Sequence, residues 1–280
     1  MKHSQQLKLM KPKISNDYIV KSYKYGSNLE ITTANGLISN SIRVLPDKKY
    51  LILATGEIRE MNTSAETRLD NLNSVKLTMK KLRRLISCNF GGGSNQLWIT
   101  LTFKEHITDT YLAYKSFDRF IKRLNRKYKN LLYIAIIEPQ ASGRWHFHVL
   151  LKDTTENTLF ISNKELSKLW GNGFTKVNRL HEGDNIANYV ISYVSDLAYE
   201  TDVTNNKKKI AKGARLYLYP KGLRIYRSSR NVNRPVEKTG LKGDLLEEYE
   251  ISHFPNYVKE TTHKTENDKE IKIITEYYNN

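Results

Sequence analysis

The chain has 280 residues, with 46 Lys and Arg against 29 Asp and Glu and a formal net charge of +17. A chain of this length can bury a core without disulfides, and its single cysteine, Cys88, excludes an internal disulfide framework. We find no apolar run of about 20 residues and no signal-peptide pattern, so we expect a soluble, cytoplasmic protein without a membrane partner.

The positive charge favours polyanions as partners, with nucleic acid ahead of an anionic membrane surface. The alternative is a solubilising surface in a chain rich in Lys and Asn. The charge is unevenly distributed. Residues 201–240 carry eleven Lys and Arg against two acids, whereas residues 241–280 carry five against nine. We therefore expect a basic DNA-binding extension over 201–240 and an acidic, mobile tail over 241–280.

The first part of the chain gives the weaker structural signals. Residues 1–40 are polar, lack clean periodicity and are expected to form a flexible arm. Residues 41–92 are expected to form an N-terminal extension. Within it, a short apolar run predicts a strand or hairpin over 41–60, and leucines at three- and four-residue spacings predict a helix over 64–89. The Gly-rich segment 90–94 marks its end.

The middle of the chain has the clearest patterns. Strict alternation predicts a strand over 97–103, and Thr108 or Asp109 can cap the helix that follows it. That helix has one apolar stripe, formed by Ala113, Phe117, Phe120, Ile121, Leu124 and Tyr128. Residues 131–151 indicate a hairpin with a turn at 139–143.

The pattern continues with a helix near 162–170, a turn and strand over 171–180, and a helix over 185–197. This order predicts an α+β fold with an antiparallel sheet covered by helices. A Rossmann fold is excluded because no Gly-rich phosphate loop follows a strand.

A pair of histidines stands on the second strand of the hairpin. Alternate residues of a strand share a face, so His146 and His148 project together while Phe147 points away. Two imidazoles on one face can bind a divalent cation, although two such histidines also occur by chance. Glu138 ends the preceding strand, and across the turn its carboxylate can reach the same face. Two histidines and one carboxylate would leave coordination positions open for water and substrate oxygens.

Two tyrosines stand four residues apart in the helix expected over 185–197. Tyr189 and Tyr193 therefore share one helix face. A tyrosine hydroxyl can attack phosphorus and form a covalent phosphotyrosine. The alternative is core packing, which is the commoner role of such a pair in a chain with 18 tyrosines.

Three groups of residues, in this order, resemble the motifs of HUH endonucleases. They are Thr100-Leu-Thr102, Glu138 with Gly143-Arg-Trp-His-Phe-His148, and Tyr189-Val-Ile-Ser-Tyr193. Within that superfamily the chain looks most like the rolling-circle replication initiators of plasmids and phages in low-GC Gram-positive bacteria. The likeness covers about residues 50–235. It includes the Thr55-Gly-Glu57 turn, Trp170-Gly-x-Gly-Phe174 and Tyr219-Pro-x-Gly-x-x-x-Tyr-Arg227, which are supportive only.

The resemblance implies a nicking domain over 93–200 with a sheet of about five antiparallel strands. It implies Mg²⁺ or Mn²⁺ as the metal, with His146 and His148 as ligands and Glu138 as the third. It also implies site-specific nicking of an origin strand, a 5′-phosphotyrosine link and a free 3′-OH, followed by rejoining. Tyr193 is expected to be the principal nucleophile and Tyr189 a second one or a helper.

The implied partners are single-stranded or cruciform origin DNA and, from the host, a helicase and a polymerase. Many relatives carry lysine beside or three residues after the second tyrosine, where this chain has Ser192 and Asp196. That departure leaves open which tyrosine attacks first, and it suggests that Asp196 approaches the metal.

Further DNA contacts are expected around the site. Arg144 can hold a phosphate. Trp145 can stack a base or belong to the core, and the sequence favours neither. Thr100 and Thr102 of the first motif, together with Asp196, are also candidates. The basic extension adds a set interleaved with tyrosines: Lys207, Lys208, Lys209, Arg215, Arg224, Arg227 and Arg230. The alternative for that set is a solvated basic linker.

Two other functions remain open at this point. A relaxase or a single-strand transposase would use the same chemistry, but relaxases usually carry three clustered histidines and the small transposases are shorter. A non-catalytic DNA-binding protein would explain the charge and leave the histidines without a chemical role.

Overall fold

The computed structural model describes residues 9–34, 42–53, 55–61, 63–180, 186–187, 215–264 and 270–279. The chain divides into two compact units, one formed by Met1–Thr63 with Pro235–Asn280 and the other by Ser64–Arg234. The fold is α+β with antiparallel sheets, as the order of predicted elements indicated. No helix in the described ranges is long and apolar enough to cross a membrane.

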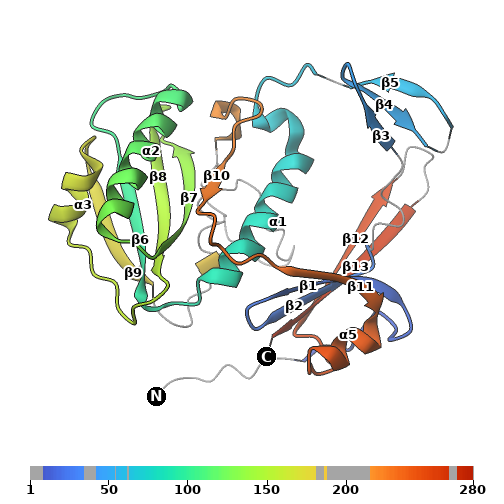
Figure 1. Cartoon of the computed structure of the whole chain (residues 1–280). Helices are drawn as coiled ribbons and strands as arrows, with labels where there is room; N and C mark the ends of the chain where they lie inside the picture. Colours follow the sequence, from blue (N-terminus) through green and yellow to red (C-terminus); the bar gives the residue numbers. More distant parts are fainter. Residues whose placement is uncertain are drawn as a thin grey trace, which may run out of the picture. The chain divides into compact units, whose positions relative to one another are not determined.

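The larger unit, Ser64–Arg234, is built on a five-stranded antiparallel sheet (Figure 1). In spatial order its strands are β10 (Tyr226–Ser228), β7 (Leu131–Pro139), β8 (Trp145–Asp153), β6 (Gly93–Thr102) and β9 (Thr175–Leu180). Its helices are α1 (Leu72–Asn89), α2 (Thr110–Lys127) and α3 (Asn163–Trp170), with short 3₁₀ helices η1 (Arg68–Asn71) and η2 (Leu216–Leu218). The predicted hairpin is confirmed as β7 and β8, and β8 lies at the centre of the sheet.

The two faces of this sheet have different surroundings. On one face, Phe147 of β8 stacks on Phe117 of α2 with ring centroids 4.7 Å apart, and Trp170 of α3 contacts Phe120 of α2 at 5.8 Å. The opposite face carries His146 and His148, because side chains alternate along a strand. On that face the Nζ of Lys152 donates a hydrogen bond of 3.1 Å to the carbonyl of Asn89 at the end of α1. Helices therefore pack on both faces.

Helix α2 forms where the sequence predicted it. Of the two candidate caps, Asp109 is the one used, and its side chain accepts hydrogen bonds from the amides of Tyr111 at 2.7 Å and Leu112 at 3.3 Å. The predicted stripe faces the core: Ala113, Phe117, Phe120, Ile121 and Leu124 are all buried. Burying each of the large apolar side chains contributes about 1.5 to 3 kcal/mol, so the stripe fixes α2 on the sheet.

The segment after α3 docks against the end of β6. Gly171 ends α3 in the left-handed conformation with a φ of 65°. The amide of Thr102 then donates to the carbonyl of Phe174 at 2.8 Å, and the Trp170 indole N–H donates to the carbonyl of Thr102 at 3.1 Å. At Gly173, φ is 147° and an added Cβ would lie 2.3 Å from the amide nitrogen of Lys104. Only glycine fits this close approach.

The smaller unit, Met1–Thr63 with Pro235–Asn280, joins both ends of the chain. Its five-stranded sheet has the order β11 (Val236–Leu241), β1 (Ile19–Tyr25), β2 (Asn28–Thr32), β13 (Glu270–Asn279) and β12 (Tyr257–Lys264). Helix α5 (Lys242–Glu248) places Leu245 and Leu246 in the same core as Val20 and Ile31. A separate three-stranded sheet comprises β3 (Ile42–Leu45), β4 (Lys49–Ile52) and β5 (Ile58–Glu60).

These observations correct three of the expected segments. Strands β1 and β2 occupy residues 19–32, where we expected a flexible arm over 1–40. Residues 241–280, expected as a mobile tail, include α5, β12 and β13. The expected 41–92 extension is divided, because the unit boundary follows Thr63 and α1 belongs to the larger unit. The physical reason is the same for both ends: their strands pair with each other over more than 200 residues of sequence.

Candidate metal centre

The two histidines lie on one face of the central strand, as the alternation predicted. In β8, His146 pairs with Thr102 of β6 on one side and with Glu138 of β7 on the other. His148 pairs with Thr100 of β6. Directly paired residues of antiparallel strands present their side chains on the same face. The register therefore gathers the two imidazoles, the carboxylate and two threonine hydroxyls on one side of the sheet.

Glu138 reaches this face because the β7–β8 turn is short. The amide of Gln140 donates to the carbonyl of Arg144 at 2.8 Å, and Gly143 adopts a positive φ of 82°. These contacts hold the register in which Glu138 stands opposite His146. The predicted reach of its carboxylate across the hairpin is observed.

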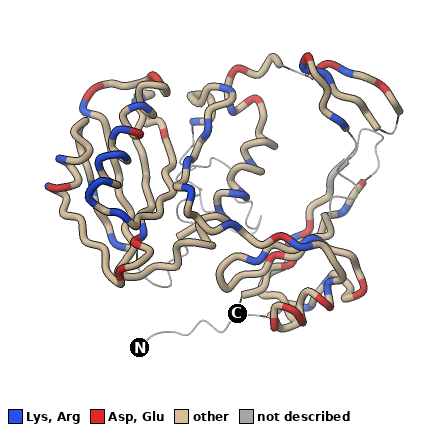
Figure 2. Tube along the Cα trace, viewed as in Figure 1, with Lys and Arg blue, Asp and Glu red and all other residues tan. Residues whose placement is uncertain are grey.

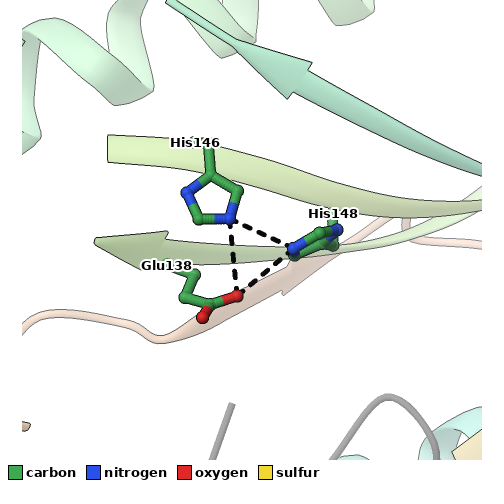
Figure 3. A group of neighbouring side chains, drawn as sticks. All are labelled: Glu138, His146 and His148. Atoms are coloured by element: carbon green, nitrogen blue, oxygen red, sulfur yellow. Dashed lines mark hydrogen bonds and ion pairs between the residues drawn. The ribbon is translucent and has the colours of Figure 1, made fainter. Parts of the chain in front are cut away.

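The three side chains point toward one another (Figure 3). His146 Nε2 lies 3.1 Å from His148 Nε2 and 3.5 Å from Glu138 Oε2, and His148 Nε2 lies 3.2 Å from that same oxygen. In a cation site with bonds of about 2.1 Å, neighbouring ligands lie about 3.0 Å apart in an octahedron and about 3.4 Å apart in a tetrahedron. The observed edges lie at these spacings, so one cation can contact all three atoms from one side.

Burial makes this arrangement costly without a cation or a proton. All three side chains are buried, and Glu138 Oε2 and His146 Nδ1 have no aligned hydrogen-bond partner in the described part of the chain. Two imidazole nitrogens 3.1 Å apart repel each other unless a proton or a cation lies between them. The donor set, two nitrogens and one carboxylate oxygen, suits a divalent cation with open positions.

The carboxylate of Glu138 is held in its charged form. Burial raises its pKa, but the two imidazoles beside it lower that pKa more strongly, to about 2. A carboxylate that stays ionised at neutral pH can serve as a metal ligand without losing a proton first.

Strand β6 orients one of the two imidazoles. The hydroxyl of Thr100 lies 3.3 Å from His148 Nδ1, and the Trp98 ring lies beside the His148 ring with centroids 5.2 Å apart. If Nδ1 carries the proton and donates it to Thr100 Oγ1, the lone pair of Nε2 faces the group of ligand atoms. Thr100 was expected as a DNA contact, and its alternation with Trp98 on β6 was the available signal for this other role.

The residues flanking the histidines have structural partners. Trp145, for which the sequence left base stacking and core packing open, is buried, and its indole N–H donates to the carbonyl of Thr108 at 2.7 Å. Its ring packs against Tyr219 with centroids 5.3 Å apart. The base-stacking assignment is therefore wrong for this conformation. Arg144 donates to the Gln140 side chain at 2.8 Å, and Thr102 is half-buried opposite His146.

Part of the expected basic DNA surface is engaged within the larger unit. Arg215 donates to the carbonyl of Pro139 at 2.9 Å, directly after Glu138. Arg227 lies 3.1 Å from Asp118 and 3.5 Å above the Tyr114 ring of α2, on the face away from the histidines. These two contacts correct the expectation that both side chains contact DNA. Arg224 and Arg230 are exposed.

The predicted nucleophiles lie outside the described residues. They are Tyr189 and Tyr193, and the same holds for Asp196 and for Lys207, Lys208 and Lys209. Just before them, Ile186 and Ala187 are helical and buried in the core of the larger unit. Sequence reasoning missed Tyr219 as a support for the site. Its ring is fully buried, and its hydroxyl donates to the carbonyl of Ile137 at 3.0 Å.

Comparisons with known proteins point to replication. Residues 96–198 match a family model whose description is replication-associated protein ORF2, a match that covers less than half of the chain. Phasyl DNA replicon protein arp of Escherichia coli is 39% identical over 61 residues, which is 21% of this chain and 21% of that protein. No solved structure gives a significant match. The matched region contains the Glu138, His146 and His148 group and both tyrosines, and it supports a replication-associated role for this chain.

Proposed function

We propose that this protein initiates rolling-circle replication by nicking and rejoining a single DNA strand at an origin, with a tyrosine as the nucleophile. The observation that carries the proposal is the buried group of Glu138, His146 and His148, whose ligand atoms lie 3.1 to 3.5 Å apart inside the replication-associated match. These three residues would hold Mg²⁺ or Mn²⁺, which would polarise the scissile phosphate.

The protein's own residues would carry the transesterification. The hydroxyl of Tyr193 attacks the scissile phosphorus, and the bond from phosphorus to the 3′ oxygen breaks. The phenolic proton leaves to solvent or a base, and the departing 3′ oxygen gains one. The product is a 5′-phosphotyrosine and a free 3′-OH, which can prime synthesis. Rejoining reverses these steps when a 3′-OH attacks the phosphotyrosine. The ordinary pKa of tyrosine is about 10, so in-line placement matters more than ionisation at neutral pH.

A replication initiator accounts for more observations than the other two candidates. The descriptions of both matches name replication, which favours an initiator over a relaxase or transposase. A non-catalytic DNA-binding protein has no use for two imidazoles and a carboxylate buried together, because burying such groups unpaired costs several kcal/mol.

The experiment that tests the proposal is nicking of supercoiled plasmid carrying the protein's own origin, with Mn²⁺ or Mg²⁺ present. We expect nicked circles with protein joined to the 5′ end. The double variant Tyr189→Phe/Tyr193→Phe should bind the same DNA and leave it uncut. A covalent adduct that still forms in the double variant would overturn the assignment of the nucleophile. Nicking that persists in His146→Ala would overturn the metal-assisted mechanism.

A further inference from the structure

The exposed face of α2 carries a row of four basic side chains. Lys115, Arg119, Lys122 and Arg126 stand at successive spacings of four, three and four residues, and all four are exposed. Such spacings place residues on one side of a helix. We call these four residues the α2 basic stripe. Figure 2 shows the positive charge along this helix.

The stripe is free of competing acids within the described part of the chain. Asp118 is the one acid of α2, and it is paired with Arg227 at 3.1 Å. The other two basic residues of the helix have partners too. Arg123 donates to the carbonyl of Leu169 at 2.7 Å, and Lys127 pairs with Glu165. Each contact leaves the four stripe side chains as the ones without an acidic partner among the described residues.

The stripe and the metal centre lie on opposite sides of the same sheet. α2 packs through Phe117 on Phe147, which points away from the face that holds His146 and His148. The stripe is on the outer side of α2, so it is not a wall of the candidate metal centre. A ligand held there contacts the protein away from the proposed chemistry.

We propose that the α2 basic stripe binds the sugar-phosphate backbone of duplex DNA. From the first to the last member the stripe spans about 16 Å of helix, given a rise of about 1.5 Å per residue. Over that length one strand of B-DNA presents about five phosphates, so four cations at this spacing can follow it.

The chemistry of the stripe favours duplex over single-stranded DNA. Single strands are held by aromatic side chains on which bases stack, together with basic residues. The stripe has no aromatic member, and the nearest exposed ring, Tyr111, lies 5.9 Å from the Lys115 ammonium. Cations alone suit a duplex, whose bases are stacked inside and whose phosphates are outside. The proposed nicking would be served by such a grip, but the stripe's binding does not depend on that reaction.

The test is the salt dependence of binding to a short duplex of arbitrary sequence, measured by fluorescence anisotropy with the full chain. In the variant, all four stripe residues become glutamine, which preserves helix propensity. Each lost phosphate contact lowers the slope of log K against log salt by about 0.9, so we expect a decrease of about three to four and affinity reduced at least tenfold at about 0.1 M salt. An unchanged slope would overturn the proposal.

A matched control separates a specific surface from net charge. Glutamine at Lys11, Lys48, Lys49 and Lys259, all exposed in the smaller unit, removes the same four charges. We expect this control to keep most of the slope, and an equal loss in both proteins would contradict the proposal. An oligo-dT strand of the same length should lose less affinity than the duplex in the stripe variant. The reverse order would assign the stripe to single strands. Mn²⁺ binding should be unchanged in the stripe variant, so a failed nicking mechanism stays distinguishable.

Discussion

At the scale of single residues, the candidate metal centre depends on groups that do not touch the metal position. Thr100 holds His148 through Nδ1, whereas no described residue bonds Nδ1 of His146. The outer partners of metal-bound histidines fix the ring and its tautomer, and their loss typically weakens metal binding about 10- to 100-fold.

We therefore expect Thr100→Val to weaken Mn²⁺ binding about tenfold or more, and Thr100→Ser to keep it near the native value. The serine hydroxyl can still accept the Nδ1 proton, and valine cannot. Thr102→Val is the matched control on the same strand and face, opposite His146, and should change the affinity little. Isothermal titration calorimetry measures all three. A Thr100→Val protein that binds Mn²⁺ like the native chain would show that the contact does not position His148.

At the scale of elements, the close approach of Gly173 to the end of β6 is the most specific constraint. A Cβ there would lie 2.5 Å from the Thr102 carbonyl and 2.3 Å from the Lys104 amide nitrogen, and the φ of 147° is strained for any other residue. Both clashes are with backbone, so no side-chain movement relieves them.

We expect Gly173→Ala to lower the free energy of unfolding by about 3 kcal/mol or more, through strain and lost hydrogen bonds at the end of β6. Gly91→Ala is the matched control, because nothing lies within 4 Å of its added Cβ, and it should be nearly neutral. Urea unfolding followed by tryptophan fluorescence is suitable, since Trp98, Trp145 and Trp170 all lie in the larger unit. Equal midpoints for the two variants would contradict the constraint.

The sequence predicted the elements of the larger unit well because their signals are local. Alternation over 97–103, the apolar stripe of α2 and the 131–151 hairpin each lie within a few turns or one strand pair. Strands β1 and β2 escaped prediction because they pair with β11 and β13; Thr32, for example, stands opposite Thr275. No local pattern records a pairing over that distance.

The site was predictable to a similar degree. The positions of His146, His148 and Glu138 follow from strand alternation and a short turn, and the structure places them together. The burial of Trp145 and the bond from Arg215 to Pro139 did not follow, because each depends on chain segments far away in sequence.

At the scale of the whole molecule, one buried carboxylate joins the two ends of the chain. Glu276 of β13 pairs with Lys242 of α5 at 2.8 Å, and both side chains are fully buried. It also accepts hydrogen bonds from the amide of Ile14 at 2.9 Å and from the Tyr278 hydroxyl at 2.6 Å. Removing one partner of a buried pair is strongly destabilising, by about 3 to 5 kcal/mol.

This carboxylate gives a testable pH dependence. Burial raises the pKa of Glu276, but Lys242, Tyr278 and backbone amides lower it more, so its folded pKa lies below the ordinary value. Its contribution to stability is then complete above the unfolded pKa of about 4.3 and declines as the pH falls toward and through the folded value. We expect hydrogen exchange of β2 and β13 peptides to accelerate over that range. In Glu276→Gln, exchange should already be fast at neutral pH and respond little to acid, and a native-like profile would contradict the role.

The central claim is that Glu138, His146 and His148 together hold one divalent cation, and Mn²⁺ titration of the full chain by calorimetry tests it most directly. We predict one site per chain, weakened more than about 100-fold in His146→Ala and in Glu138→Gln. His106→Ala removes an exposed histidine of the same unit and should leave the affinity unchanged. Equal Mn²⁺ affinity in the native chain and His146→Ala would contradict the claim.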